Sequence, residues 1–275
     1  MAAGDAAASK GRQEDAGRGT AAQAKLSIRG VGKRFGALEA VAGCGFDIAP
    51  GTIVSIVGPS GCGKTTLLWM MSGLHQPTEG QILLDGTAVT GPRPEIGLVF
   101  QEANLLPWRN LIDNIHFPFE IKGLRPETAW IDHLIERVGL RGFERRFPRE
   151  LSGGMQQRAA IVRALALRPS VLLMDEPFGA LDAFTREDMN RLVEEIWLET
   201  RTTIVFITHS IEEAIFLSDR VVVLSKRPGR VQSDYAVPFA HPRTLETMAS
   251  REVFDLMNRI KADIYGAPAP ARAAE

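Results

Sequence analysis

The chain has 275 residues, of which 45% are hydrophobic and 24% are charged, and its formal net charge is −1. This composition is typical of a globular protein with a large core, and the near-neutral charge gives no argument for binding to nucleic acid. No stretch approaches about 18 consecutive apolar residues, so the sequence predicts no membrane-spanning helix.

The two ends of the chain differ in composition from the rest. Residues 1–24 are rich in Ala and Gly, and charged side chains such as Asp5 and Lys10 interrupt any apolar core of a signal peptide. Residues 266–275 are rich in Ala and Pro. We expect both ends to be disordered tails.

The first predicted elements are strands. Strand-like segments occur at residues 25–35, 44–48 and 81–85. They predict an antiparallel sheet that lies beside a phosphate-binding core.

A phosphate-binding loop follows the second of these segments. Ile53–Val57 is a short apolar run, and a helical stretch without a breaker begins at Thr65. Between them the chain fits the pattern GxxxxGK[ST], in which glycine N–H groups and a helix N-terminus surround phosphate oxygens. A plain Gly-rich turn is the alternative, and the flanking strand and helix favour the phosphate loop. The residues predicted to hold a nucleoside triphosphate are Gly58, Pro59, Ser60, Gly61, Cys62, Gly63, Lys64, Thr65 and Thr66.

Two residues of this loop have specific predicted roles. Lys64 is expected to reach the β and γ phosphates, and the Thr65 hydroxyl is expected to ligate Mg²⁺.

The sequence contains two cysteines, Cys44 and Cys62, which are too few for a disulfide framework and lack the spacing of a metal site. A reducing cytoplasm fits this usage. Cys62 lies inside the phosphate loop, where a helix N-terminus can lower the pKa of a thiol. We therefore expect a maleimide to inactivate the protein and ATP to protect it. The alternative is that Cys62 only fills space.

A helical insert is predicted over about residues 102–168. Gln101 precedes it and follows the apolar strand Gly97–Phe100, at the strand end where ligands gather in open α/β sheets. Within the insert, apolar side chains recur at helical spacing from Trp130 to Val138. This periodicity predicts an amphipathic helix.

A second anion site is predicted in the segment Leu151–Gln157, which reads Leu-Ser-Gly-Gly-Met-Gln-Gln. Ser152, Gly153 and Gly154 open a helix predicted over residues 155–167, and their N–H groups and the Ser hydroxyl can bind an anion. Such a site has no role in a lone nucleotide-binding domain. It could close over a phosphate held by another copy of the chain.

Two carboxylates follow the next apolar run. Val171–Met174 predicts a strand that is covered on both faces, as in a parallel sheet. Because Mg²⁺ prefers carboxylate oxygen and the attacking water needs a base, we expect Asp175 to be the Mg²⁺ partner and Glu176 to polarise the water. The alternative is that Asp-Glu-Pro merely ends a strand at a turn, which would be preferred if the motif stood alone.

The last part of the chain supplies one more candidate site residue. An apolar strand over residues 203–208 ends at His209, and Val221–Leu224 predicts another buried strand. A helical stretch over residues 244–265 follows a Pro-containing linker. We expect a main domain over residues 25–240 and a C-terminal helical extension over residues 241–265.

Together these segments resemble the ATP-binding cassette family, and the resemblance covers about residues 26–230. The motifs occur in the family's order: the phosphate loop, Gln101, the segment Leu151–Gln157, the strand with Asp175 and Glu176, the loop Gly179–Asp182, and His209. The resemblance implies an α/β fold, with a P-loop NTPase core built on a mostly parallel sheet, an antiparallel β lobe and a helical subdomain.

The resemblance also implies an ATPase with ATP and Mg²⁺ as cofactors. Glu176 would act on the attacking water, His209 would contact the γ-phosphate, and Gln101 would touch Mg²⁺ and water. The implied metal ligands are Thr65, Gln101 and Asp175. Phe35 is similar to the aromatic residue that stacks on adenine in this family, although an aromatic residue at the end of a strand is more often plain core.

A second copy of the chain is the first implied partner. In the family, Ser152, Gly153 and Gly154 face the γ-phosphate of ATP bound to the opposing subunit, so that two ATP molecules are sandwiched in a two-fold dimer. Asp182 would communicate across this dimer. One copy alone should hydrolyse ATP poorly.

Permease subunits are the second implied partner, because this chain carries no membrane-spanning segment of its own. The protein would then lie at the cytoplasmic face of the cell membrane, as a peripheral subunit. In the family, a groove near the Gln101 loop receives a short permease helix. Exposed Leu and Trp side chains suit such a protein contact, and Leu105, Leu106 and Trp108 lie in this loop. For Leu105 and Leu106, a place in the core is an equally good interpretation. This loop, with residues 225–230, resembles importer ATPases for nitrate, sulfonate and taurine, which work with a solute-binding protein.

Other classes fit the sequence less well. Soluble members of the family that act on nucleic acid or ribosomes usually carry a long coiled coil or two cassettes, whereas this chain has one cassette and a short insert. A P-loop kinase would leave Leu151–Gln157 and His209 without a role. A module that binds ATP without hydrolysis is disfavoured by Glu176 and His209. For the cargo, the resemblance favours a small anion.

Overall fold

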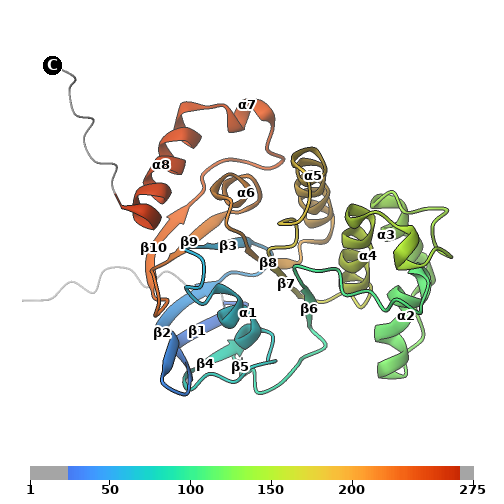
Figure 1. Ribbon diagram of the computed structural model, residues 1–275, viewed down its shortest axis with the longest axis horizontal. Helices are drawn as coiled ribbons and strands as arrows, with labels where there is room; N and C mark the ends of the chain where they lie inside the picture. The colour runs from blue at the N-terminus through green and yellow to red at the C-terminus, as the bar shows by residue number, and fades with distance from the viewer. Residues whose placement is uncertain (1–23, 267–275) are drawn as a thin grey trace, which may run out of the picture.

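The computed structural model describes residues 24–266, which form two sheets and several helices (Figure 1). The predicted tails lie outside the described residues, except for Ala24 and Gly266.

The smaller sheet is antiparallel and has the strand order β2-β1-β4-β5. Its strands are β1 (Leu26–Phe35), β2 (Leu38–Ile48), β4 (Glu79–Leu84) and β5 (Thr87–Ala88). Strand β2 begins six residues before the predicted start at Cys44. The reason is a tight hairpin, in which Phe35 pairs with Leu38 and Gly36 takes the left-handed conformation that a short turn requires.

The larger sheet has the order β10-β9-β3-β8-β7-β6, and all its neighbouring strands are parallel except β10, which is antiparallel to β9. Its strands are β3 (Ile53–Val57), β6 (Ile96–Val99), β7 (Val171–Asp175), β8 (Thr203–Ile207), β9 (Arg220–Leu224) and β10 (Val231–Ala236). Strand β10 was not predicted, because its side chains alternate between partly buried and exposed and give no apolar run.

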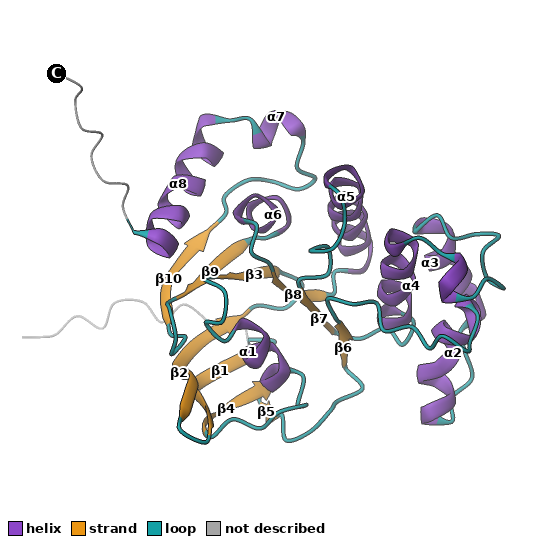
Figure 2. Cartoon of the chain, in the orientation of Figure 1, coloured by secondary structure: helices purple, strands orange, loops and turns teal. Residues whose placement is uncertain are grey.

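Both faces of the larger sheet are covered, which explains its continuous apolar strands. Helix α1 (Lys64–Met71) lies between the two sheets, and α5 (Ala183–Thr200) and α6 (Ile211–Leu217) cover the opposite face (Figure 2). In β8, Ile204 and Phe206 join the core under α5, whereas Val205 and Ile207 join the core around α1. This alternation follows from the two-residue period of a strand.

The predicted helical insert contains α2 (Leu111–Lys122), α3 (Thr128–Arg137) and α4 (Gly153–Leu165), which lie together at one end of the molecule (Figure 1). Helix α4 begins two residues before its predicted start at residue 155, because the Ser152 hydroxyl caps it by accepting a hydrogen bond from Met155 N at 3.3 Å. It ends two residues early, at Leu165.

The C-terminal helical stretch is two helices, α7 (Leu245–Met248) and α8 (Arg251–Tyr265). The break occurs where Ser250 caps α8 by accepting a hydrogen bond from Val253 N at 3.3 Å. Helix α8 buries Val253, Leu256, Ile260 and Ile264 in a core shared with α6 and β9. Within residues 24–266, no helix combines the length and the apolar character needed to cross a membrane.

Candidate functional site

The phosphate loop connects the end of β3 to the start of α1, at the edge of the sheet where the parallel strands end. Glycine is required at two of its positions. Gly58 has φ 155° and a Cβ there would lie 2.7 Å from the Leu224 carbonyl oxygen, and Gly63 has φ 103° and a Cβ would lie 2.7 Å from the Ala40 carbonyl oxygen. Side chains are therefore excluded by both backbone conformation and space.

The loop presents positive charge and open donors. Gly63 occupies the N-cap of α1 without a capping side chain, so the N–H groups of the first turn are left for a ligand to satisfy. The Lys64 side chain is folded onto the loop itself, where Nζ donates to the carbonyl oxygens of Gly58 at 3.0 Å and Pro59 at 3.2 Å. An anion in the loop would offer this ammonium group a charged acceptor in place of two neutral ones.

The first carboxylate lies beside the start of α1. Asp175 ends β7 and is 7% exposed, and its Oδ1 accepts a hydrogen bond from the Thr65 hydroxyl at 3.1 Å. Burial raises the pKa of the Asp175 carboxyl; the Thr65 hydrogen bond opposes this shift and the neighbouring Glu176 charge adds to it. A hydroxyl and a buried carboxylate side by side form an oxygen donor set that suits Mg²⁺.

The second carboxylate contacts the predicted histidine. Glu176 Oε2 lies 3.2 Å from His209 Nδ1, and the Glu176 backbone has φ 42°, which is uncommon for a residue with a side chain. This conformation is fixed by the sheet, because Glu176 N donates to the Ile207 carbonyl oxygen of β8 at 2.9 Å. The carboxylate and the imidazole therefore form a pair at the ends of two adjacent strands.

Gln101 also lies at this place. A Cβ built on Gly179 would lie 3.7 Å from Gln101 Nε2 and 3.9 Å from Glu176 Oε2, so both side chains reach the same small volume. The structure thus brings Gln101, Asp175, Glu176 and His209 to one edge of the sheet, next to the phosphate loop.

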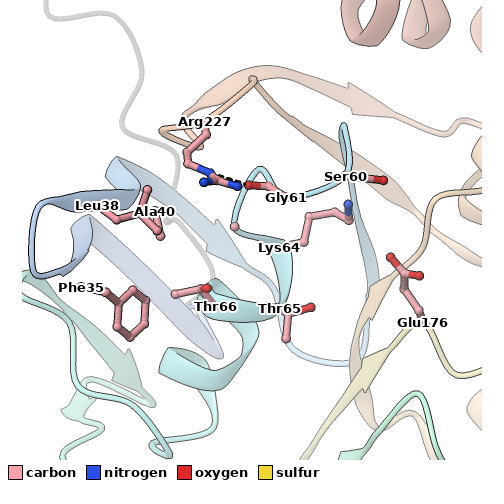
Figure 3. Close-up of a pocket in the computed structure, with 11 residues that line it drawn as sticks. Phe35, Leu38, Ala40, Ser60, Gly61, Lys64, Thr65, Thr66, Glu176 and Arg227 are labelled. Atoms are coloured by element: carbon pink, nitrogen blue, oxygen red, sulfur yellow. Dashed lines mark hydrogen bonds between the residues drawn. The ribbon is translucent and has the colours of Figure 1, made fainter.

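A cleft of about 360 Å³ opens beside the phosphate loop (Figure 3). Phe35 lies in its wall and is 44% exposed, with its ring 5.9 Å from the His75 ring and 5.2 Å from Lys33 Nζ. The other lining residues are Leu38, Ala40, Ser60, Gly61, Gly63, Lys64, Thr65, Thr66, Glu176 and Arg227.

Sequence reasoning missed three lining residues: Leu38, Ala40 and Arg227. Leu38 and Ala40 belong to the part of β2 that was not predicted as strand. Arg227 lies in the segment 225–230, which contributes to the resemblance to importer ATPases but was not predicted to lie at the nucleotide site.

The second anion site is not part of this cleft. Ser152 and Gly153 are exposed at the start of α4, and a Cβ on Gly153 would meet no atom within 4 Å. None of Ser152, Gly153 and Gly154 lines the cleft, and α4 lies among the insert helices, apart from α1 (Figure 1). A single chain therefore does not bring the two predicted phosphate sites together.

Asp182 is also absent from the cleft lining, and it caps α5. Its Oδ1 accepts hydrogen bonds from Phe184 N at 3.1 Å and Thr185 N at 3.0 Å, and its Oδ2 accepts one from the Thr185 hydroxyl at 2.6 Å. The bonds from Thr185, led by its hydroxyl, lower the pKa of the Asp182 carboxyl. Exposed at a helix N-terminus, this residue holds the loop before α5 in place.

The expectation of a reactive thiol at Cys62 is wrong. The residue is 1% exposed and its Sγ lies 3.1 Å from a Cβ built on Gly58, inside the core around α1. Burial raises the pKa of the Cys62 thiol, and the nearby Lys64 charge does not outweigh this effect. The backbone of Cys62 belongs to the phosphate loop, but its side chain points into the protein.

Comparisons with known proteins identify the family of the chain. Residues 41–179 match the family model described as "ABC transporter". The chain is 48% identical, over 222 residues that cover 78% of it and 83% of the relative, to "Taurine import ATP-binding protein TauB" of Jannaschia sp. (strain CCS1).

The solved structures that are similar to this one include the following two. One is cbiO1 from Clostridium perfringens, described as part of the ABC transporter complex cbiONQ, with TM-score 0.72, 26% identity and coverage of 86% of this chain and 95% of that one. The other is a dimeric post-hydrolysis state of the ATP-binding cassette MJ0796 bound to ADP and Pi, with TM-score 0.68, 30% identity and coverage of 78% and 100%.

Proposed function

The chain belongs to the ABC transporter family and is the ATP-hydrolysing subunit of an importer, and we propose that its importer carries taurine or a closely related small sulfonate. The observation that carries the choice of solute is the 48% identity, over most of both chains, to a relative named for taurine import. The relatives give no support to the alternative of an ATPase that acts on nucleic acid or ribosomes.

In the proposed binding mode, ATP occupies the cleft with adenine against Phe35 and its phosphates in the loop from Gly58 to Thr66. Lys64 exchanges the carbonyl oxygens of Gly58 and Pro59 for the β and γ phosphates. Thr65 and Asp175, which already share a hydrogen bond of 3.1 Å, would hold Mg²⁺ together with Gln101. The ion, when bound, supplies positive charge that neutralises the phosphate oxygens.

We assign the activation of water to Glu176 and His209. The Glu176 carboxylate lines the cleft beside the loop, and the contact of 3.2 Å with His209 Nδ1 holds it in position. Glu176 would accept a proton from the attacking water, and His209 would donate to the γ-phosphate and keep the water aligned. Gln101, whose side chain reaches the same small volume as that of Glu176, would contact the same water.

We also propose that the working form is a homodimer. Ser152, Gly153 and Gly154 form a helix N-terminus whose first two residues are exposed, and none of the three lines the cleft of their own chain. In a two-fold head-to-tail dimer, they would bind the γ-phosphate held by the other copy, and Asp182 would lie near the same boundary. The dimeric state of the MJ0796 cassette bound to ADP and Pi supports a dimer.

The proposed permease contact is the loop that follows Gln101. Trp108 is 71% exposed, and Arg109 beside it forms an ion pair with Glu120 at 2.7 Å. The loop is held from within, because Asn114 is fully buried and its side chain bonds to Leu106 N at 2.7 Å and to three carbonyl oxygens. A rigid loop with an exposed Trp is suited to docking on a protein. The chain would then be peripheral, at the cytoplasmic face of the membrane, and served by a solute-binding protein.

The test is reconstitution of the chain in proteoliposomes with the permease and the solute-binding protein encoded beside it. We expect taurine to raise ATP hydrolysis and to enter the liposomes, and a complex with Glu176→Gln should show neither effect. Stimulation by nitrate but not by taurine or other sulfonates would overturn the choice of solute. Hydrolysis that responds to DNA or ribosomes, without a permease in the complex, would overturn the importer.

A further inference from the structure

Arg227 is a cation in the wall of the nucleotide cleft that the proposed function does not use. It lies in the loop between β9 and β10, and its Nε donates a hydrogen bond to the Gly61 carbonyl oxygen at 3.0 Å (Figure 3). The side chain is exposed and lines the same cleft as Phe35 and the phosphate loop. The guanidinium is thus one peptide unit away from the N–H groups that would hold phosphate.

The position of Arg227 is fixed by the backbone of its loop. Gly229 N donates to the Ala40 carbonyl oxygen at 3.0 Å, and Ala42 N donates to the Gly229 carbonyl oxygen at 3.0 Å. A Cβ on Gly229 would lie only 2.1 Å from the Cys62 carbonyl oxygen, so this loop packs directly on the phosphate loop. Arg227 is therefore held at the cleft before any ligand arrives.

The charges of the cleft favour a second cationic side chain, besides Lys64, as a contact for an anionic ligand. Among the lining residues, Lys64 and Arg227 are positive and Glu176 is negative, so Lys64 alone would leave the protein part of the cleft close to neutral. One N–H of the Arg227 guanidinium is used by Gly61, and within residues 24–266 Nη1 and Nη2 have neither a hydrogen bond nor an ion pair. Four donors are consequently available to an anion, in an orientation that the Gly61 bond has already set.

We propose that Arg227 binds the phosphate chain of the nucleotide, with Nε on the Gly61 carbonyl oxygen and its Nη groups on phosphate oxygen. The inference rests on the proposed nucleotide site, and it adds a binding residue from a loop outside the phosphate motif. Because Arg227 lies away from the paired Glu176 and His209, it stabilises bound ATP and the transition state alike. Its loss should raise KM and leave kcat nearly unchanged.

The test compares Arg227→Gln with Lys226→Gln, which removes the same charge from an exposed neighbour that does not line the cleft. Isothermal titration calorimetry should show about a tenfold higher Kd for ATP in Arg227→Gln at low salt, the effect of one lost charge-assisted hydrogen bond, and no change in Lys226→Gln. Arg227→Lys should recover part of the affinity. The difference between Arg227→Gln and the wild type should shrink at high salt, because salt screens an exposed charge.

Two results would overturn the proposal. If Arg227→Gln binds ATP as tightly as Lys226→Gln does, Arg227 makes no contact with the nucleotide. If the loss is the same at all salt concentrations and Arg227→Lys recovers nothing, Arg227 only positions the loop. Lys64→Ala serves as the reference, because retained ATP binding in that variant would refute the nucleotide site itself.

Discussion

Replacing His241 by Ala should destabilise the protein far more than the same change at His133. Each histidine forms an ion pair with a glutamate of α5, and both N–O distances are 2.5 Å. The His241 and Glu194 side chains are 7% and 4% exposed, whereas those of His133 and Glu199 are 42% and 39% exposed. The two pairs therefore differ chiefly in burial, and His241 has a second carboxylate near it, with Asp219 Oδ1 at 3.6 Å from its Nε2.

The expected magnitudes follow from that burial. Without His241, the buried Glu194 carboxylate keeps a hydrogen bond from Arg243 N at 2.9 Å but loses its charged partner, which costs about 3 kcal/mol. The His241 ring also packs on Trp197 at 4.7 Å, which contributes about 1 kcal/mol. An exposed pair such as the one of His133 contributes at most about 1 kcal/mol. Urea unfolding at pH 6, followed by tryptophan fluorescence, measures both differences.

The pH dependence of the His241 contribution has a defined sign. Burial alone would lower the pKa of His241, but the carboxylates of Asp219 and Glu194 outweigh it and the pKa is raised. A raised pKa in the folded state means that the stabilisation is complete below the unfolded value of about 6.5 and is lost as the pH rises through the folded value. The gap between wild type and His241→Ala should thus narrow from pH 6 to pH 9. Equal costs for the two histidine variants, or a gap that widens with pH, would refute the reasoning.

Three further predictions concern the nucleotide site. Glu176→Gln should bind ATP and form a stable dimer on size-exclusion chromatography, with phosphate release lowered by more than about a hundredfold; wild-type turnover in this variant would remove Glu176 from catalysis. Gly229→Ala should weaken ATP binding by more than about tenfold, because its Cβ would lie only 2.1 Å from the Cys62 carbonyl oxygen and would displace the phosphate loop, whereas Gly91→Ala, with no atom within 4 Å, should bind normally. Intact-mass analysis should find Cys62 unmodified by a maleimide at pH 7, with or without ATP, because the thiol is buried and its pKa is raised; rapid labelling that ATP prevents would contradict this.

The phosphate loop and the strand ends could be predicted because their chemistry is local. Glycines at Gly58 and Gly63 are required by positive φ and by neighbours that leave no room for Cβ, and such constraints leave a sequence pattern. Asp175 ends the apolar strand β7, His209 follows β8 closely, and parallel strands end at one edge of a sheet. The prediction that these residues lie near each other needed only the order of the motifs.

The rest of the site depends on contacts between distant segments. Arg227 reaches Gly61 only because β9 lies beside β3 in the sheet. No local sequence pattern predicts the order of strands in a sheet. Cys62 has a helix N-terminus next to it in sequence, and the direction of its side chain decides against reactivity. The start of β2 at Leu38 was missed because the hairpin geometry, rather than an apolar alternation, determines the pairing.

The two proposed contacts with partners are joined through one helix. Helix α4 has 13 residues and is about 20 Å long, and its N-terminus carries Ser152, Gly153 and Gly154. Along its length, Gln157 Nε2 donates to the Phe100 carbonyl oxygen at 3.1 Å, next to Gln101. Near its other end, Arg163 donates to the carbonyl oxygens of Ala103 and Asn104 at 2.8 Å.

A displacement of α4 must therefore move the loop that carries Trp108. We infer that ATP held by the opposite copy draws the N-terminus of α4 toward it, and that the loop follows because charge-assisted hydrogen bonds from Arg163 tie it to the helix. ATP favours the closed dimer only through contacts absent from the open one. The proposed contacts with Ser152, Gly153 and Gly154 are of this kind, and Ser152 and Gly153 are exposed in the single chain. Hydrolysis and phosphate release remove the ligand for these residues. Helix α4 can then move back, and the loop that carries Trp108 moves back with it.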